Sequence, residues 1–411
     1  MRIPCEVFSK VLERLLTMAI KGKNIGIDAR FMLRPLRGIP LYVTRLCEHI
    51  PAIAKDYTFY FFINKGFEHN DSAENYMLRL EGIQSKNENV RIINVDDDAE
   101  IRWEQMYLPR LVKEHKIDLL HMPANRICFF PGAPTVVTVH DIMEYLYLLD
   151  KKYPLSWEKN KSIKSILYNL RHRIYVALSY KYRINNAVNI ITVSRYSKDD
   201  MENNLSIDSG KVKVIYHGVD EEYFEKPSLP FDDRSHVLLL GGDSFQKNPE
   251  TAIAAWSKVN PELRNKFPLK VVGFCGSTSS PILCAIKKYG LQDEIDIKGW
   301  ISQEDMVEYF HRSVLFIFPS RYEGFGFPLI QAMATGVPVI STSKTSIPEV
   351  LGGVGFQLDP DDINGFAESI ERVLTHRSVW QKQSDTGLTR SKLFTWENSA
   401  KSHFEQYLRW L

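Results

Sequence analysis

The sequence is short of the features that mark several classes of protein. Its five cysteines are widely spaced and include no CxxC pair, which argues against a disulfide framework or a zinc site and favours a reducing compartment. Lysine and arginine number 52 against 50 aspartates and glutamates, so the basic excess typical of nucleic-acid-binding proteins is missing and no nucleic-acid partner is expected. No run approaches the roughly 18 apolar residues of a membrane span. The composition predicts a soluble α/β enzyme or binding protein of the cytoplasm.

The first 23 residues place apolar side chains at helical spacing, with charged residues between them. A signal peptide needs an uninterrupted apolar stretch, so this segment does not fit one. We expect residues 1–23 to form an amphipathic helical extension, which either packs on the body of the protein or meets a membrane surface or a partner. The apolar set is Val7, Phe8, Val11, Leu12, Leu15, Leu16 and Ala19.

From residue 24 onward, short β-forming runs alternate with longer helical patterns. Many of these runs are continuously apolar, as in strands buried on both faces, and their alternation with helices predicts parallel sheets. Thirteen strands are too many for one open sheet, so we predict two doubly wound sheets with a linker at residues 221–235, which are polar and contain two prolines. Ligands of such sheets bind at the carboxyl ends of the strands. The runs are 24–28, 58–63, 90–95, 118–122, 135–139, 189–193, 212–216, 236–240, 269–273, 294–298, 314–318, 337–340 and 354–358.

One strand–helix junction has the residues expected of a phosphate-binding loop. After the run 314–318, the chain carries a carboxylate (Glu323), two glycines (Gly324 and Gly326) and then a helical pattern. Glycines let the backbone approach a ligand closely, and a helix N-terminus favours negative charge. Spacing alone leaves a plain Gly-rich turn equally open.

The same segment resembles the E-G-F-G-x-P-x-x-E signature of the retaining glycosyltransferases of family 4, whose fold is called GT-B. Further motifs match the family in order and span residues 24 to 400, including a Trp-Glu-Gln motif typical of its mannosyltransferase-like members. These are Gly38–Tyr42, Trp103-Glu104-Gln105 with Pro109, Val139-His140-Asp141, Thr192-Val193-Ser194, His217-Gly218-Val219-Asp220, Lys247-Asn248, Ser346-Ile347-Pro348-Glu349 and Trp396-Glu397.

The resemblance implies two Rossmann-like domains that face a central cleft. Residues 24–225 would bind the acceptor, residues 236–394 the nucleotide-sugar, and residues 395–411 would form a helix that crosses back to the first domain. The expected reaction moves a hexose, mannose from GDP-mannose as first choice, to a hydroxyl of a glycan or lipid-linked acceptor in surface polysaccharide synthesis. The implied catalytic residues are His140 and Glu323, and the donor-binding residues are Gly38, Lys247, Gly324, Phe325, Gly326 and Gln331.

Three positions depart from the family pattern. Gln331 stands where the family has a second glutamate that holds the ribose, and a carboxamide accepts at only one of its ends. Gln246 stands where an arginine often precedes the lysine. Pro40 replaces a glycine of the first donor loop and so removes an N–H. A GT-B subunit that binds or scaffolds without catalysis is therefore the alternative, and a nucleotide-sugar epimerase is a weaker third.

Asp96-Asp97-Asp98 invites comparison with a DxD metal site. The resemblance implies a metal-independent enzyme without a cofactor, because helix dipoles and basic side chains neutralise the leaving diphosphate. We therefore expect this triplet to form a solvated turn.

Residues 151–183 contain nine lysines or arginines against Glu158 alone, interleaved with six aromatic residues. Basic and aromatic side chains on helices suit an anionic membrane surface or a lipid-diphosphate acceptor. This predicts peripheral attachment at the inner face of the cell membrane; a solvated helix face is the alternative.

Overall fold

The computed structural model describes residues 23–67, 76–96, 99–149, 163–274, 276 and 280–411, with the backbone alone described for 67, 148–149 and 163–170. The chain divides into two compact units. Unit 1 comprises residues up to 192 together with 201–215 and 400–411, and unit 2 comprises 193–200 and 216–399. The extension predicted at 1–23 lies outside the described residues except for Lys23, as do Asp97, Asp98 and the part of the basic segment at 151–162.

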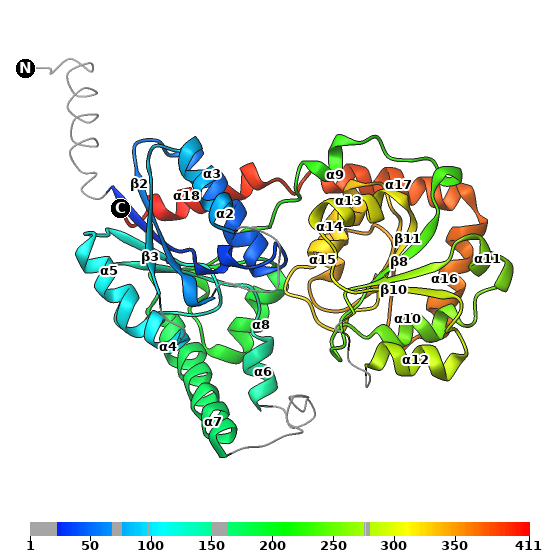
Figure 1. Cartoon of the computed structure of the whole chain (residues 1–411), viewed down its shortest axis with the longest axis horizontal. Coiled ribbons are helices and arrows are strands. Elements are labelled where there is room, and N and C mark those ends of the chain that lie inside the picture. Colours follow the sequence, from blue (N-terminus) through cyan, green and yellow to red (C-terminus); the bar gives the residue numbers. More distant parts are fainter. Residues whose placement is uncertain (1–22, 68–75, 97–98, 150–162, 275, 277–279) are drawn as a thin grey trace, which may run out of the picture. The chain divides into compact units, whose positions relative to one another are not determined.

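Unit 1 is built on a seven-stranded parallel sheet in the order β3-β2-β1-β4-β5-β6-β7. In Figure 1 its helices lie on both sides of this sheet, and the continuously apolar strands are buried accordingly. Parallel strands covered on both faces are what the apolar runs predicted. The strands are β1 (Asn24–Asp28), β2 (Thr58–Asn64), β3 (Val90–Val95), β4 (Leu119–Met122), β5 (Thr135–Val139), β6 (Asn189–Thr192) and β7 (Val212–Val214).

The helices of unit 1 are mostly crossovers between neighbouring strands. Two of the helical segments, η3 and η4, are π-helical. The α-helices are α2 (Ile39–Ile53), α3 (Tyr76–Lys86), α4 (Glu100–Arg102), α5 (Leu108–Glu114), α6 (Met143–Leu149), α7 (Ile163–Leu178), α8 (Arg195–Leu205, of which residues 195–200 belong to unit 2) and α18 (Trp396–Leu408, from residue 400). The others are η1 (Arg30–Leu33), η2 (Lys65–Phe67), η3 (Trp103–Tyr107), η4 (Ser179–Arg183), η5 (Ile184–Asn186) and η6 (Ser209–Lys211).

Unit 2 has a six-stranded parallel sheet in the order β10-β9-β8-β11-β12-β13. One hydrophobic cluster covers one face under α10, α12 and α16, and another covers the opposite face under α13, α14 and α15. Its strands are β8 (His236–Leu240), β9 (Leu269–Val272), β10 (Ile295–Lys298), β11 (Ser313–Phe318), β12 (Val339–Thr342) and β13 (Phe356–Leu358). Its helices are α9 (Glu222–Glu225), η7 (Phe231–Asp233), α10 (Pro249–Trp256), α11 (Pro261–Lys266), α12 (Pro281–Tyr289), α13 (Gln303–Arg312), α14 (Phe327–Ala334), α15 (Ile347–Leu351), α16 (Ile363–Thr375) and α17 (Arg377–Ser391).

Two doubly wound parallel sheets confirm the predicted fold class, and each of the thirteen predicted runs overlaps a strand. The division into units differs from the predicted bounds, because the segment expected to be a linker packs within unit 2. The guanidinium of Arg234 donates to the carbonyls of Ser313 (2.7 Å) and Thr335 (3.0 Å), and the backbone N–H of Val219 donates to the carbonyl of Phe394 at 3.1 Å. These contacts hold residues 216–235 against the second sheet.

The last helix contributes to unit 1 although it follows unit 2 in the sequence. Its Tyr407 hydroxyl lies 2.7 Å from Nδ1 of His121 on β4, and the side-chain amide of Asn189 on β6 donates to Gln406 at 3.0 Å. Among the described residues, no helix combines the length and apolar composition that crossing a bilayer requires.

Candidate functional site

In unit 2, the segments that follow β8 and β11 meet at the switch point of the sheet. These strands are neighbours, yet the chain leads from β8 to β9 on one side and from β11 to β12 on the other, and ligands of doubly wound sheets bind at such points. The side-chain amide of Asn248 donates to the carbonyl of Pro319 at 3.1 Å. The N–H of Arg321 donates to the carbonyl of Gln246 at 2.7 Å. The loop that carries Lys247 is therefore fixed against the Gly-rich loop.

Lys247 and Glu323, two of the residues implied by the resemblance, form an ion pair. Nζ of Lys247 lies 2.7 Å from Oε1 of Glu323, and the hydroxyl of Ser320 donates to the same oxygen at 2.6 Å. The ammonium also lies 5.2 Å from the ring centroid of Phe318, within the range of a cation–π contact. The two side chains are 29% and 12% exposed, so a ligand can reach both while the protein holds them in place.

The backbone around Glu323 is fixed by the segment that follows β12. The N–H of Glu323 donates to the hydroxyl of Thr345 at 3.1 Å. The hydroxyl of Ser346 donates to the carbonyls of Glu323 (2.9 Å) and Phe325 (3.1 Å). Thr345 has a φ of 55°, which is unusual for a β-branched residue and marks a strained turn. The Gly-rich loop is thus a built, rigid feature.

Gly326 turns this loop into α14. It has a φ of 95° and is the residue that precedes the helix, and a Cβ added there would lie 3.0 Å from the side chain of Leu329. Only glycine suits both the backbone angle and the space. Because the first N–H groups of an α-helix have no partner within the helix, Gly326 and Phe327 present N–H donors at the start of α14, whereas Pro328 has no N–H.

The remaining residues implied for unit 2 contribute in different ways. The side chain of Phe325 is buried against the ring of His217, with 4.9 Å between centroids, so Phe325 can meet a ligand only through its backbone. The carbonyl of Gly324 accepts from the hydroxyls of Ser194 (2.7 Å) and Ser197 (3.2 Å). Gln331 lies in the second turn of α14 and is largely buried.

In unit 1, His140 follows β5 and is held by the loop after β4. Its Nε2–H donates to the carbonyl of Pro123 at 2.9 Å, and its backbone N–H donates to the side-chain oxygen of Asn125 at 2.7 Å. Because a carbonyl only accepts, Nε2 carries the proton in the neutral ring and Nδ1 does not. Burial lowers the pKa of His140 to about 4, against the opposing effect of the Pro123 bond. The imidazole is therefore neutral at physiological pH.

Tyr42 connects His140 with Gly38, the other residue implied for unit 1. The Tyr42 ring meets the His140 ring edge-on, with 4.7 Å between centroids, and the Tyr42 N–H donates to the carbonyl of Gly38 at 3.1 Å. The Tyr42 hydroxyl pairs with Thr138 and with Nε2 of His403, both at 2.8 Å. The start of α2 and the end of β5 are therefore joined by one buried side chain.

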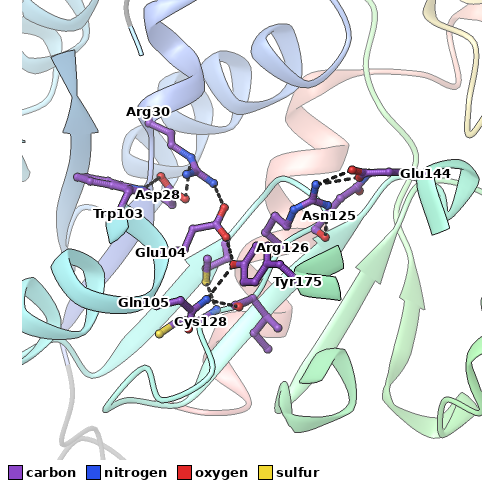
Figure 2. A network of polar contacts seen from close by, with 12 residues as sticks. Asp28, Arg30, Trp103, Glu104, Gln105, Asn125, Arg126, Cys128, Glu144 and Tyr175 are labelled. Atoms are coloured by element: carbon purple, nitrogen blue, oxygen red, sulfur yellow. Dashed lines mark hydrogen bonds and ion pairs between the residues drawn. The ribbon is translucent and has the colours of Figure 1, made fainter. Parts of the chain in front are cut away.

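A buried network of charged side chains supports the same edge of unit 1 (Figure 2). Glu104 is fully buried and accepts hydrogen bonds from the guanidinium of Arg30 and from the hydroxyl of Tyr175. Arg30 also lies 3.4 Å from Asp28 at the end of β1, and the indole N–H of Trp103 donates to Asp28 at 3.0 Å. The Trp-Glu-Gln motif thus ties η3 to the switch point between β1 and β4.

The ion pair between Arg126 and Glu144, also drawn in Figure 2, is partly exposed to solvent. The guanidinium of Arg126 donates to both carboxylate oxygens of Glu144, at 3.0 and 2.8 Å. His172 on α7 lies 3.2 Å from the same carboxylate. The hydrogen bond that His172 donates to Glu144 is the main cause that raises the pKa of His172. Burial raises the pKa of Glu144, but His172 and Arg126 outweigh it and the net shift is downward.

The structure thus brings Lys247, Glu323 and the Gly-rich loop together in unit 2, and Gly38 and His140 together in unit 1. Sequence reasoning missed the residues that hold them. The Trp-Glu-Gln and Ser-Ile-Pro-Glu motifs signalled Glu104 and Ser346 without indicating what they do. Tyr42 and Ser194 likewise lay in matched motifs, Gly38–Tyr42 and Thr192-Val193-Ser194, that did not indicate their contacts, and nothing in the sequence indicated a role for Asn125, Arg126, Ser320 and Thr345. Among the described residues no group of three or more His, Cys, Asp or Glu side chains could hold a metal ion.

Two family models match the chain. The model described as Glycosyltransferase Family 4 matches residues 37–223, and the model described as Glycosyl transferases group 1 matches residues 220–387. Their junction lies close to the boundary at residues 215–216 between the two units.

Curated relatives match a shorter stretch. O-antigen chain mannosyltransferase B of Escherichia coli is 26% identical over 250 residues, which cover 58% of this chain and 66% of that protein. O-antigen chain mannosyltransferase RfbU of Salmonella typhimurium is 24% identical over 239 residues, 58% of this chain and 60% of that protein. The serotype-specific mannosyltransferase WbdA of Escherichia coli is 27% identical over 238 residues, 54% of this chain and 29% of that protein. The chain spans less than two thirds of the length of each of these relatives.

Solved structures match nearly the whole chain. A sucrose-phosphate synthase from Thermosynechococcus elongatus has a TM-score of 0.70 at 20% identity, covering 94% of this chain and 98% of that one. The Anabaena protein HepE in complex with UDP and glucose has a TM-score of 0.66 at 17% identity, covering 94% and 99%. WaaG, a glycosyltransferase involved in lipopolysaccharide biosynthesis, has a TM-score of 0.65 at 13% identity, covering 92% and 98%.

Proposed function

The chain belongs to family 4 of the glycosyltransferases and has the GT-B fold, and from this premise we propose that it transfers a hexose from a nucleotide-sugar to a hydroxyl group. Retention of configuration is part of the proposal. Mannose from GDP-mannose is the first choice of donor, supported by the names of the curated relatives. We propose a glycan or a lipid-linked glycan of surface polysaccharide synthesis as the acceptor.

One observation carries the proposal: the Lys247–Glu323 pair lies beside the Gly-rich turn that begins α14, at the switch point of the second sheet. An ammonium and the first N–H groups of a helix suit a diphosphate, because both offer positive charge. The carboxylate suits sugar hydroxyls, because it accepts hydrogen bonds at both oxygens. Donors for a phosphate and an acceptor for a sugar thus lie side by side.

The proposed reaction needs no nucleophile from the protein. The bond between the anomeric carbon and the diphosphate oxygen breaks, and the acceptor oxygen attacks from the same face. The acceptor proton passes to the oxygen of the departing diphosphate. Lys247 and the amides of the Gly-rich loop would stabilise the charge that develops on that oxygen. Glu323 would orient the sugar, and binding energy used in this way lowers the barrier more than it tightens nucleotide binding.

His140 would meet the transferred sugar through a neutral ring. Burial keeps its pKa far below 7, so the imidazole can hydrogen-bond a hydroxyl without bringing a positive charge near an electron-poor anomeric carbon. The bonds to Pro123 and Asn125 fix the ring and its backbone, which fits a role in positioning.

The positions of two of the three residues that depart from the family pattern account for their being tolerated. Pro40 lies in the first turn of α2, where an N–H has no partner within the helix and proline is well tolerated. The backbone carbonyl of Gln246 anchors Arg321 and Ser320, a contact that any residue at this position could make. Gln331, as the proposed ribose contact, is left as the departure that bears most directly on the donor.

The alternative is a GT-B subunit that binds a nucleotide-sugar without transferring the sugar. The observation that favours it is the same ion pair: Lys247 and Glu323 already satisfy each other, so a ligand must compete with an existing contact. A nucleotide-sugar epimerase is the third candidate, supported only by the shared fold.

A nucleotide panel followed by a hydrolysis assay tests the proposal. We expect one of UDP, GDP, dTDP and ADP, with GDP as first choice, to raise the melting temperature through binding to the folded state. The matching nucleotide-sugar should then release free sugar slowly in the absence of acceptor. Release of an epimer would support the epimerase. Nucleotide binding with neither product would support the non-catalytic subunit and overturn the enzyme.

The cytoplasm, at the inner face of the cell membrane, is the proposed location. A lipid-linked acceptor and the relatives named for O-antigen synthesis support it.

A further inference from the structure

The outward face of the helical segment α7–η4 carries apolar side chains. Ile174, Leu178 and Tyr182 are 52%, 41% and 59% exposed, and their spacing of four residues places them along one side of the segment. Tyr175, Val176 and Tyr180 face the interior of unit 1 and are buried. A helix on a water-exposed surface ordinarily shows the reverse, with polar side chains outside. A covering partner for this face is therefore expected.

Cations flank this apolar row. Arg171, Arg173 and Lys181 are exposed on the same segment, and the sequence contains no Asp or Glu from Lys159 to Lys198. Lys181 lies 5.7 Å from the ring centroid of Tyr182. The charged side chains that this segment itself contributes beside the apolar row are thus all cationic.

The loop after β4 extends the surface at its C-terminal end. Phe130 is 75% exposed, and the guanidinium of Arg183 lies 5.3 Å from its ring centroid. Neighbouring Phe129 stacks on Tyr175 of α7, with 5.7 Å between centroids, which holds the loop against the helix. We name this surface, comprising Phe130, Arg171, Arg173, Ile174, Leu178, Lys181, Tyr182 and Arg183, the α7 face.

We propose that the α7 face docks on an anionic lipid bilayer. Apolar and aromatic side chains would enter the boundary between headgroups and acyl chains, and the flanking cations would meet lipid phosphates, the combination that interfacial helices use. An acidic protein partner would account for the cations alone, whereas a bilayer accounts for the cations and for the exposed apolar row. The inference assigns membrane contact to 171–183 and 130 rather than to the N-terminal extension, and it does not depend on the donor chemistry.

Sedimentation with vesicles tests the inference. The full chain is mixed with vesicles of phosphatidylglycerol and phosphatidylcholine in equal parts, and with vesicles of phosphatidylcholine alone, at low and high salt. We expect binding to the anionic vesicles that weakens with salt, because exposed charges are screened. Equal binding to both vesicle types, or no binding, would overturn the proposal.

Two pairs of variants separate the contributions of charge and apolar contact. Arg171→Gln with Lys181→Gln should weaken binding to anionic vesicles about 25-fold, on the order of fivefold for each cation. Ile174→Ser with Leu178→Ser should weaken it at least roughly fivefold, by removing apolar insertion. The matched controls are Lys287→Gln with Lys288→Gln on α12 and Leu393→Ser, all exposed residues of unit 2, and they should bind like the parent.

Two outcomes in folded variants would overturn the assignment of membrane contact to the α7 face. One is an equal loss of vesicle binding in the controls and in the α7 variants. The other is self-association of the parent that the α7 variants abolish while vesicle binding stays unchanged, since the face would then join copies of this chain. Donor hydrolysis without vesicles is measured on the same preparations. Vesicle binding without hydrolysis would count against the proposed function alone, and hydrolysis without vesicle binding would count against the α7 face alone.

Discussion

The side-chain oxygen of Asn125 accepts a hydrogen bond from the backbone N–H of His140 at 2.7 Å, and Asn125 itself has a φ of 58°. Asparagine is among the few residues that adopt this left-handed conformation at small cost. One residue therefore supplies both the turn after β4 and the contact that fixes the candidate sugar-binding histidine.

This relationship predicts different costs for two replacements. Asn125→Ala should lower the free energy of unfolding by about 2 kcal/mol, because it removes a partly buried hydrogen bond and adds left-handed strain. Asn125→Gly should lower it by about 1 kcal/mol, because glycine accepts the backbone angle. Urea unfolding of both variants gives the two values. If alanine proves no worse than glycine, strain at this position contributes nothing.

Glu104 gives a prediction about buried charge. Replacing it with Gln leaves Arg30 in the protein interior with one carboxylate fewer, and breaking a buried pair costs about 3 kcal/mol. The exposed pair Arg110–Glu114, with 3.9 Å between its charged atoms, is the matched control. Glu114→Gln should change the unfolding free energy by less than about 0.5 kcal/mol. Similar losses in the two variants, measured by urea unfolding, would refute the assigned role of the network.

Glu323 tests the enzyme against the non-catalytic subunit. Glu323→Gln keeps the shape and removes the charge, so we expect at least about a 100-fold loss of transfer, roughly 2.7 kcal/mol of barrier. Affinity for the nucleoside diphosphate should change less than about threefold, because the carboxylate acts on the sugar. Initial rates and calorimetry on the same preparations provide both numbers. His140→Ala should likewise lose transfer with nucleotide affinity largely kept.

An equal loss of rate and affinity in Glu323→Gln would place the carboxylate in the nucleotide site. The ion pair makes this outcome informative, since Lys247 loses its partner in the variant. Lys247→Gln is the comparison, and it should weaken nucleotide binding more than Glu323→Gln does, because it removes the cation proposed to meet the diphosphate.

The side chain of Gln331 is the proposed contact with the ribose of the nucleotide, and its replacement tests that contact. Gln331→Ala should weaken nucleotide binding by about 1 kcal/mol, the net contribution of a neutral hydrogen bond. Gln331→Glu should bind at least as well as the parent, because a carboxylate accepts from two hydroxyls. Calorimetric titration with the preferred nucleoside diphosphate compares the three proteins. Indistinguishable affinities would mean that residue 331 does not face the ligand.

The burial of His140 predicts how stability varies with pH. The pKa of His140 is lowered to about 4, and an unfolded histidine titrates near ~6.5. The unfolded chain therefore holds the proton more tightly, so the stabilisation present above pH ~6.5 is lost as the pH falls toward 4. His140→Gln should reduce the loss of unfolding free energy between pH 7 and pH 5 by about 2 kcal/mol.

Urea unfolding of the parent and of His140→Gln at the two pH values measures this difference. His121 and His236 are also buried, and burial lowers the pKa of each, so the parent should lose more than His140 alone explains. Identical losses in parent and variant would mean that the pKa of His140 is the same in the folded and unfolded states.

The sequence predicted the fold well because its strands are buried on both faces. The run 314–318 is apolar throughout and lies within β11, and the run 135–139, made of valine and threonine, is buried throughout as β5. Parallel sheets give the strongest signal of this kind. The bounds of the units were harder to predict, because residues 221–235 are polar and contain two prolines, a composition that suggested a linker. The packing of Arg234 on four backbone carbonyls is a tertiary effect that local composition does not carry.

The residues of the candidate site also differ in whether local sequence pattern or tertiary contacts determine their role. Gly326 and Glu323 follow a strand and precede a helix, so local pattern and resemblance both pointed to them. Thr345 and Asn125 act through contacts with residues 22 and 15 positions away, and their left-handed backbone angles follow from those loops. Short-range pattern cannot reveal a hydrogen bond that depends on how two loops meet.

The bond between His121 and Tyr407 joins residues 286 positions apart, and it has a consequence for synthesis on the ribosome. Domains generally fold from the N-terminus as they emerge, but here the N-terminal unit receives residues 400–411 last. Until residues 400–411 have been synthesised, His121, Tyr42 and Asn189 lack the partners that α18 brings. Unit 1 therefore begins first in the sequence, but it can be completed only after all the residues of unit 2 have been synthesised.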